Sequence, residues 1–357
     1  MSSELRPGRA AVLPLQLVPV TDGVIIKRGR MELRVAGAGA YGLTLRVLDR
    51  MARGLPPDDG DDPNVRRLLE ELDRHRLLVP AASADGDGHV ETPLDLFYWS
   101  AGPAAADAAE RAAKARVTVV GVNEVSRTLV GNLLAAGFES VEVVNYPFLC
   151  NLRLLDESGT VEPREWTPSL PQPVEYASWA AVSDVGDDVD CLVATSDFGG
   201  LELMRVWNVY CARRGIAFLP VVLQDLVGYV GPLFLPGETA CFECARVRRN
   251  SNVDNPETFR AAEELAFVGQ GVNAAFHPAL PAVLGNLAAL EVSRFLGEWA
   301  SPRTIGTLVE VDLLAPQLTA RPVLKLPRCP VCGTAERRST TELFCNVLLP
   351  GTHGPHG

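Results

Sequence analysis

Residues 117–126 read VTVVGVNEVS, which is a short apolar strand followed by a glycine turn and the start of a helix. Gly137 is placed to end that helix, and residues 141–144 form a second β-branched strand. Two more apolar strands are predicted at residues 191–194 and 218–222. Strands that alternate with helices in this way predict an α/β domain of Rossmann-like type, with a mostly parallel sheet covered by helices on both faces.

The turn after the first strand is a degenerate version of a nucleotide-binding turn. A phosphate-binding turn needs glycines where the backbone approaches the pyrophosphate, with a helix N-terminus behind it. Here only Gly121 of the G-x-G-x-x-G pattern is present, while Asn123 replaces the second glycine and Glu124 adds a negative charge. The acidic residue expected to hold the ribose is replaced by Asn145. The sequence therefore favours a fold kept for its architecture, without bound nucleotide.

Four cysteines form two CxxC pairs, Cys241 with Cys244 and Cys329 with Cys332. Each pair can present two thiolates to one metal ion, and 84 residues separate the two pairs. Zn²⁺ in a structural role takes four such ligands in a tetrahedron. Because no secretory signal is expected at the N-terminus, a metal site is favoured over disulfides. The sequence therefore predicts a structural zinc that ties two distant segments together.

The composition restricts the class of protein. The chain has 357 residues, of which 47% are hydrophobic and 22% are charged, a balance typical of globular domains, with two expected at this length. The net charge of −11 argues against nucleic acid as a partner, because phosphate binding needs a concentrated basic surface. No apolar run reaches the ~18 residues of a membrane-spanning helix. We therefore expect a cytoplasmic protein that has no membrane partner.

The N-terminal 80 residues predict a separate small domain. Extended or β-branched stretches lie at residues 12–20, 24–26 and 31–35, and apolar residues at helical spacing follow at 41–51 and 65–72. Three strands followed by helices indicate a winged-helix-like domain. The chain is therefore divided into residues 1–80 (winged-helix-like domain), 81–116 (linker and helix), 117–335 (Rossmann-like domain with the cysteines) and 336–357 (C-terminal tail).

Four segments make the second domain resemble the ubiquitin-activating, ThiF-type superfamily. They are DCLVATSD at 190–197, PGETACFEC at 236–244, PAVLGN at 281–286 and CPVCG at 329–333. The resemblance implies zinc bound by the four cysteines and a homodimer. Active members adenylate a carboxylate with ATP, and the resemblance implies that Asp197 corresponds to their metal-binding aspartate.

The chain departs from the active members at several positions. Asn151-Leu152-Arg153 is a partial match to an Asn-Leu-Asn-Arg-Gln segment that binds phosphates in them, and no lysine occurs between Lys114 and Lys325. No cysteine lies between the CxxC pairs, where some members carry a thioester nucleophile. We therefore interpret the chain as a pseudo-enzyme without an ATP cofactor. Its vestigial nucleotide site comprises Gly121, Asn145, Arg153 and Asp197.

The N-terminal domain resembles the PqqD-like recognition element of ribosomal peptide biosynthesis. In that family a leader peptide adds to the third strand and packs against the last helix, which is an example of β-augmentation. The resemblance implies peptide contacts at Glu32, Leu33, Arg34 and Val35 of the third strand and at Arg66, Leu69, Asp73 and Arg74 of the last helix. The alternative is that these arginines form a solvated helix face and that Leu69 is part of the core.

The two resemblances together indicate a ThiF-like, leader-peptide-binding partner of YcaO-type cyclodehydratases in azole and thiopeptide biosynthesis. Such a protein would bind the leader of a precursor peptide and deliver it to an ATP-dependent enzyme that forms azolines from Cys, Ser or Thr, without bond-making chemistry of its own. Two alternatives stay open. One is an active enzyme that adenylates a peptide or carrier, and the other is an activator of a sulfur carrier, which leaves the N-terminal domain without a role.

Overall fold

The computed structural model describes residues 10–13, 15–53, 55–58, 62–80, 93–101, 105, 107–149, 151, 154, 166, 169–181, 188–224, 226–251, 255, 257–258, 261, 265, 277–312, 314–315 and 317–333. Contacts within the chain divide it into two compact units, residues 1–106 and residues 107–357. The division falls inside the segment 81–116 that the sequence assigns to a linker and helix. The predicted tail at 336–357 lies outside the described residues.

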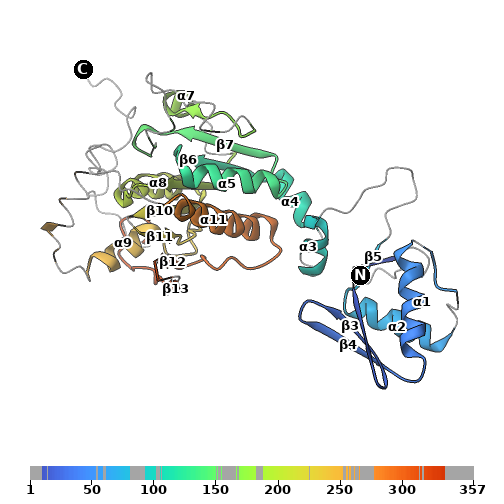
Figure 1. The fold of residues 1–357 in the computed structure, drawn as a ribbon. Coiled ribbons are helices and arrows are strands. Elements are labelled where there is room, and N and C mark those ends of the chain that lie inside the picture. Colours follow the sequence, from blue (N-terminus) through green and yellow to red (C-terminus); the bar gives the residue numbers. More distant parts are fainter. Residues whose placement is uncertain are drawn as a thin grey trace, which may run out of the picture. The chain divides into compact units, whose positions relative to one another are not determined.

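The first unit contains an antiparallel sheet of three strands in the order β2-β3-β4 (Figure 1). Strand β2 spans Gln16–Val20, β3 spans Gly23–Arg28 and β4 spans Met31–Ala36. A two-residue turn joins β3 to β4, and β4 lies at the free edge of the sheet. The predicted extended stretch at 12–20 is divided in two, because Val12 ends β1 (Ala10–Val12), which pairs with β5 (Leu78–Pro80) and not with β3.

Two amphipathic helices complete the core of the first unit. Helix α1 spans Ala40–Ala52 and α2 spans Pro63–Arg74, while α3 (Pro93–Ala101) follows later in the chain. The side chain of Asp62 accepts a hydrogen bond from the backbone of Asn64, and Pro63 opens the helix, so both favour the start of α2 at this point. The buried core is formed by side chains such as Ile26, Val47, Leu68 and Leu72. The sheet and these two helices confirm the predicted fold class of the small domain.

The second unit is built on an eight-stranded sheet in the order β13-β12-β11-β10-β9-β6-β7-β8. Five strands are parallel: β6 (Arg116–Val120), β7 (Ser140–Asn145), β8 (Val174–Glu175), β9 (Cys191–Ser196) and β10 (Ala217–Gln224). Antiparallel strands β11 (Val227–Val230), β12 (Thr307–Asp312) and β13 (Gln317–Pro322) extend it. Strand order reverses between β6 and β9, where Rossmann-like folds place their ligand sites.

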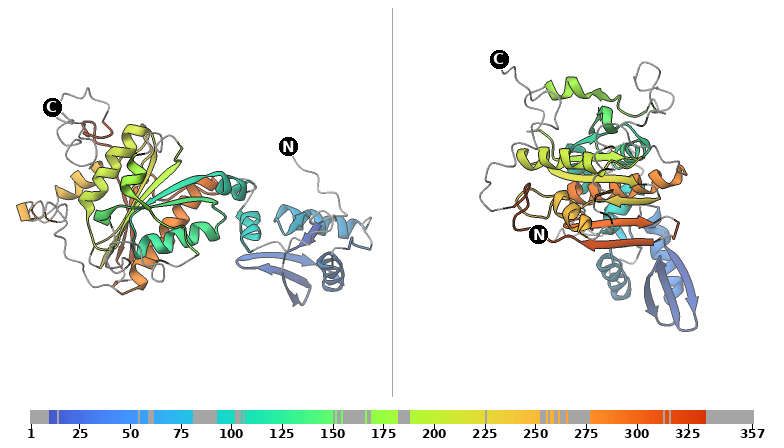
Figure 2. Two further views of the ribbon diagram at one scale, coloured as in Figure 1. Left: turned by 90° about the horizontal axis from the view of Figure 1, so that it is seen from above. Right: turned by 90° about the vertical axis from the view of Figure 1, so that its left-hand side faces the viewer.

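Helices cover both faces of this sheet (Figure 2). Helices α5 (Glu124–Ala135) and α11 (Ala279–Gly297) pack together on one face, over a core that includes Val119, Val193 and Leu219. Helix α8 (Leu201–Arg214) and the cysteine-bearing α9 (Phe242–Asn250) lie on the other face, against side chains such as Val120 and Phe218. Shorter helices are α4 (Ala108–Lys114), α7 (Tyr176–Ala181) and the 3₁₀ turn η2 (Pro147–Leu149). The predicted α/β architecture is confirmed.

Helix α11 is the single described helix whose length and composition would allow it to cross a membrane, and 44% of its most apolar window is buried inside the protein. Its contacts account for this composition, because it packs against α5, α4, β10 and β11. Gly285 brings α11 close to α5, since a Cβ atom at this position would lie 2.7 Å from the carbonyl oxygen of Val125. The apolar sequence of α11 therefore fits a core helix.

Candidate functional site

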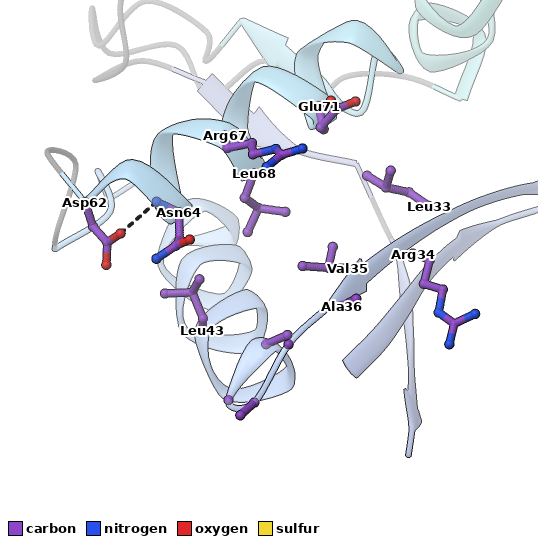
Figure 3. A pocket seen from close by; sticks show the side chains of 14 residues that line it. Leu33, Arg34, Val35, Ala36, Leu43, Asp62, Asn64, Arg67, Leu68 and Glu71 are labelled. Carbon is purple, nitrogen blue, oxygen red and sulfur yellow. Dashed lines mark hydrogen bonds between the residues drawn. The ribbon is translucent and has the colours of Figure 1, made fainter. Parts of the chain in front are cut away.

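A groove of about 780 Å³ runs along β4 in the first unit. Strand β4 forms one wall, α2 forms the other, and the start of α1 lies at one end (Figure 3). Leu33 and Val35 of β4, Leu43 of α1 and Leu68 of α2 form the apolar part of a mixed lining that also contains charged residues. The groove therefore places apolar side chains next to the free edge of β4.

The backbone of β4 has unused hydrogen-bonding groups along this edge. In the hairpin, Arg28 pairs with Met31 across the two-residue turn, and Gly37 donates to the carbonyl oxygen of Asp22 at 2.8 Å. Hydrogen-bonded pairs alternate along an antiparallel ladder. Between these two ends, the hydrogen-bonded pairs are therefore Ile26 with Leu33 and Val24 with Val35. The backbone groups of Leu33 and Val35 are used in bonds to β3. The backbone groups of Glu32, Arg34 and Ala36 therefore point away from β3, toward the free edge.

Most charged side chains around the groove have partners inside the protein. Arg34 binds the Asp22 carboxylate at 2.7 Å, an exposed ion pair that lowers the pKa of Asp22. Asp62 accepts from the backbone of Asn64 at 2.7 Å. Glu71 of α2 pairs with Arg74 at 2.7 Å. Arg67 lines the groove and makes no ion pair with another described side chain.

The predicted peptide contacts are distributed unevenly around this groove. Leu33, Arg34 and Val35 line it, whereas Glu32 pairs with Lys27 at 2.8 Å. The four residues predicted on the helix do not line the groove as the structure describes it; these are Arg66, Leu69, Asp73 and Arg74. The helix contributes instead the adjacent stripe Asn64, Arg67, Leu68 and Glu71. The i, i+3, i+4, i+7 spacing of this stripe is visible in the sequence.

In the second unit, Asn123 fills the turn between β6 and α5. Its side-chain amide nitrogen donates to the carbonyl oxygens of Leu149 at 3.1 Å and Thr195 at 3.0 Å, while its oxygen accepts from the backbone of Ser126 at 3.0 Å. Asn123 is fully buried. Gly121 has φ +105°, and a Cβ atom there would meet the Thr195 carbonyl oxygen at 2.7 Å. The turn therefore needs its one glycine, and the Asn123 side chain joins it to β9.

Asp197 follows β9 and is 1% exposed. Its Oδ2 accepts hydrogen bonds from the Glu124 backbone and from the Asn151 side chain, both at 2.9 Å. Its Oδ1 has no hydrogen-bond partner among the described residues. Burial raises the pKa of this carboxyl group, and the bonds from Asn151 and Glu124 oppose that rise. The carboxylate therefore engages the first backbone N–H of α5, where a phosphate-binding fold would present its helix N-terminus.

The other predicted nucleotide positions lie along the same edge of the sheet or outside the described residues. Asn145 ends β7, is 4% exposed, and donates its side-chain amide to the Glu175 carboxylate at 2.9 Å. Arg153 lies outside the described residues. The roles of Asn123 and Asn151 were missed by the sequence analysis. The signal for Asn123 was its position three residues before Ser126, a pair that forms a capping box at the start of α5.

The four cysteines come together as a compact cluster. All four sulfur atoms lie within 4.8 Å of one another. The Sγ–Sγ separation is 3.6 Å for Cys241 and Cys329 and 3.4 Å for Cys244 and Cys332. A tetrahedral zinc ion with Zn–S bonds of about 2.3 Å requires sulfur atoms about 3.8 Å apart. The cluster therefore fits a metal ion held by four thiolates.

Local structure positions these sulfur atoms. Cys241 precedes α9 and Cys244 lies in its first turn, while the second pair follows β13 in a turn closed by the bond from the Gly333 backbone to the Cys329 carbonyl oxygen at 2.9 Å. The backbone of Leu326 points at Cys244 Sγ from 3.4 Å. A backbone donor that faces this sulfur favours the thiolate form that binds metal.

A buried ion-pair network supports the same helix. Arg246 binds Glu243 at 2.9 Å and Glu202 at 2.7 Å, and Arg205 binds Glu243 at 3.1 Å. These four side chains are 2–21% exposed. The network links α8, which starts shortly after Asp197, to the cysteine-bearing α9. Each helix supplies one glutamate and one arginine three residues apart, but the network was not predicted, because the two helices are far apart along the chain.

Comparisons with known proteins agree with this architecture. Residues 167–331 match the ThiF family. No curated protein matches the chain at a significant level. Among solved structures, E. coli MccB bound to MccA-N7isoASN is 16% identical with a TM-score of 0.64, and the match covers 91% of this chain and 100% of that one. MccB has also been solved with ATP, with a TM-score of 0.63 and 16% identity, covering 91% of this chain and 99% of that one.

A heterocyclase in complex with substrate and cofactor also matches, at 17% identity and a TM-score of 0.56. The match covers 91% of this chain and 39% of the heterocyclase. At these identities the structures establish a common fold, while the family match rests on the sequence. The family match lies within the second unit and includes Asp197, Cys241, Cys244 and Cys329, and it ends one residue before Cys332. This chain therefore carries a ThiF family domain.

Proposed function

We propose that this protein binds the leader of a ribosomally made precursor peptide and delivers it to an ATP-dependent YcaO-type cyclodehydratase. The partner enzyme would form azolines from Cys, Ser or Thr, and this chain would contribute no bond-making chemistry. Holding the leader keeps the rest of the peptide near the partner's active site, at an effective concentration of roughly millimolar for a short flexible link. The proposed setting is the cytoplasm, with the protein acting as a homodimer.

The observation that carries this proposal is the groove along the free edge of β4. An extended peptide can pair with the outward backbone groups of Glu32, Arg34 and Ala36 while its side chains enter the groove. Main-chain hydrogen bonds would then supply affinity, and the apolar lining of Leu33, Val35 and Leu68 would supply selectivity. We propose that the parts of the peptide that extend beyond the groove contact the remaining predicted residues of α2, which are Arg66, Leu69, Asp73 and Arg74.

The related structures support a role with peptides. MccB has been solved in complex with N-formylated MccA as a biosynthetic enzyme of microcin C7, with a TM-score of 0.65 to this chain. The heterocyclase was solved with its substrate and cofactor, and this chain aligns with only 39% of it. The rest of the heterocyclase has no counterpart in this chain. We propose that a separate enzyme supplies the corresponding reaction.

The nucleotide turn supports a non-catalytic role. The Asn123 side chain takes the space where a second glycine would allow a pyrophosphate to approach the backbone. Asp197 already accepts the first backbone N–H of α5. The carboxylate of Glu124 stands at the same helix start, paired with Arg127. A phosphate at this helix end would therefore displace an internal bond and meet negative charge.

The cysteine cluster supports a structural zinc ion. We propose that Cys241, Cys244, Cys329 and Cys332 hold it, because four thiolates leave no position open for water or substrate. The zinc would fix the start of α9 to the segment after β13, and so stabilise one end of the ThiF family domain.

An adenylating enzyme is the second candidate. Asp197 is present at the end of β9, and MccB, which has the same fold, has been solved with ATP. Exchange of labelled pyrophosphate into ATP in the presence of a bound peptide would support this function. The absence of such exchange with a peptide that binds tightly would support the scaffold.

Peptide selection on the full-length protein tests the binding role. A random dodecapeptide display library is selected on the wild-type protein. The affinities of the selected peptides, called winners below, are then measured by fluorescence anisotropy for the wild type and for two variants.

Ala36→Pro removes one outward N–H without a change in charge, and proline is tolerated at such an edge position. Ala36→Val keeps that N–H. We expect the winners to lose about tenfold or more in affinity for Ala36→Pro and little for Ala36→Val. Equal binding to both variants would refute β-augmentation at β4.

A further inference from the structure

We infer that Arg67 makes the groove selective for an extended peptide in which an acidic side chain alternates with apolar ones. This inference rests on the proposed peptide-binding function and names the class of peptide that the groove accepts. Three features of the groove support it, namely the ion pairs of its charged residues, the reach of Arg67, and the side-chain spacing of a strand added to β4.

The first step is the charge that remains available in the groove. Its lining includes four charged residues, Arg34, Asp62, Arg67 and Glu71. Arg34 is paired with Asp22, Asp62 is engaged at the start of α2, and Glu71 is paired with Arg74. Arg67 has no partner of this kind among the described side chains. Arg67 therefore presents a guanidinium group that makes no ion pair with a described side chain, while the Asp62 carboxylate, which caps α2, keeps its negative charge.

The second step is the position of that charge. Arg67 extends from α2 into the space in front of β4, above Leu68 and toward Leu33 (Figure 3). The start of α1 adds positive potential at the end of the groove, because Gly39 provides no side-chain cap and the first turn has no acidic residue. A guanidinium group can bind a carboxylate with two parallel hydrogen bonds. The carboxylate of a bound peptide is therefore the complementary group.

The third step is the spacing of the peptide. Successive side chains of a strand point to opposite faces, so only every second side chain of an added strand faces α2. Those side chains meet the apolar surface of Leu33, Val35, Leu43 and Leu68 and the guanidinium group of Arg67. The accepted sequence is therefore an alternating one, in which an acidic residue stands two positions from an apolar residue. Side chains between them face away from the helix.

Charge reversal tests this selectivity. The dodecapeptide library is selected in parallel on full-length wild type, on Arg67→Glu and on Arg46→Glu. Arg46 provides a matched control, because it is an exposed arginine of the same unit that does not line the groove. We expect acidic residues to be enriched on wild type and on Arg46→Glu, and basic residues on Arg67→Glu. Circular dichroism melting curves establish that the three proteins are equally folded.

A charge-swap cycle gives the decisive reading. A wild-type winner should bind Arg67→Glu about tenfold more weakly, and replacing its acidic residue by Lys should restore binding to this variant. If winners depend on the β4 edge, as shown by loss with Ala36→Pro, but keep their acidic preference on Arg67→Glu, the role of Arg67 is wrong and the peptide-binding function stands. If winners ignore Ala36→Pro, the proposed function fails with it.

Discussion

Asp197 is a buried carboxylate that has a hydrogen-bonding partner for only one of its two oxygens among the described residues. Burial raises its pKa in the folded protein above the value of about 3.9 in an unfolded chain. The folded state therefore binds this proton more tightly than the unfolded state, so the carboxyl group favours folding at low pH and this contribution is lost as the pH rises through the folded pKa. A residue that opposes stability at neutral pH is typical of a present or former functional site.

The variant Asp197→Asn tests this cost. We expect it to be more stable than wild type at pH 8 by about 1 kcal/mol, because it removes a buried charge and keeps an acceptor for the Glu124 backbone. The difference should shrink as the pH is lowered through the folded pKa of Asp197 toward the unfolded value. Urea denaturation over a series of pH values measures it. A variant that is less stable than wild type at pH 8 would contradict the assigned burial cost.

Asn123 is expected to stabilise the turn that it fills. Asn123→Ala removes the cap of α5 and leaves the carbonyl oxygens of Leu149 and Thr195 without this donor, so the free energy of unfolding should fall by about 2 kcal/mol. Asn132→Ala is the matched control, because Asn132 bonds to Asn286 at an exposed site between α5 and α11. A loss at position 123 no larger than at position 132 would show that the network does not hold the turn.

At the scale of single elements, the cysteine cluster joins α9 to the segment after β13. Cys329→Ser should lose the metal and lower the free energy of unfolding by at least about 4 kcal/mol, since the remaining thiolates repel one another and cannot complete the tetrahedron. Metal content by mass spectrometry and a melting curve check this result. Cys211→Ser is the control, because Cys211 is buried outside the cluster. A folded, metal-free Cys329→Ser variant would contradict the structural role.

The elements that the sequence predicted are those with a strong local pattern. The parallel strands at 117–120, 141–144 and 191–194 are short segments rich in apolar and β-branched residues, and α1 and α2 have apolar faces of helical period. The antiparallel extension β11–β13 was not predicted, because β12 and β13 are largely half-buried or exposed and carry mixed residues. Which helix face borders the groove depends on how α2 packs against β4, and packing is not encoded in the spacing of α2 alone.

At the scale of the whole molecule, the chain contains two compact units with separate hydrophobic cores. The cysteine cluster belongs to the second unit, and the peptide groove to the first. Metal removal by a chelator should therefore lower the unfolding temperature of one part of the protein and leave the other unchanged. Differential scanning calorimetry of the full chain with and without chelator measures this. A uniform shift of all transitions would show that the units unfold as one.

We propose that this chain is a peptide-binding scaffold and not an adenylating enzyme. Isothermal titration calorimetry of the full-length protein with Mg-ATP separates the two functions, and requires no knowledge of the precursor peptide. For a scaffold we expect no heat of binding up to millimolar nucleotide, because Asn123 and Asp197 occupy the turn and the start of α5 with internal hydrogen bonds. Binding in the micromolar range that is lost in Asp197→Ala would instead identify an active nucleotide site and overturn the scaffold role.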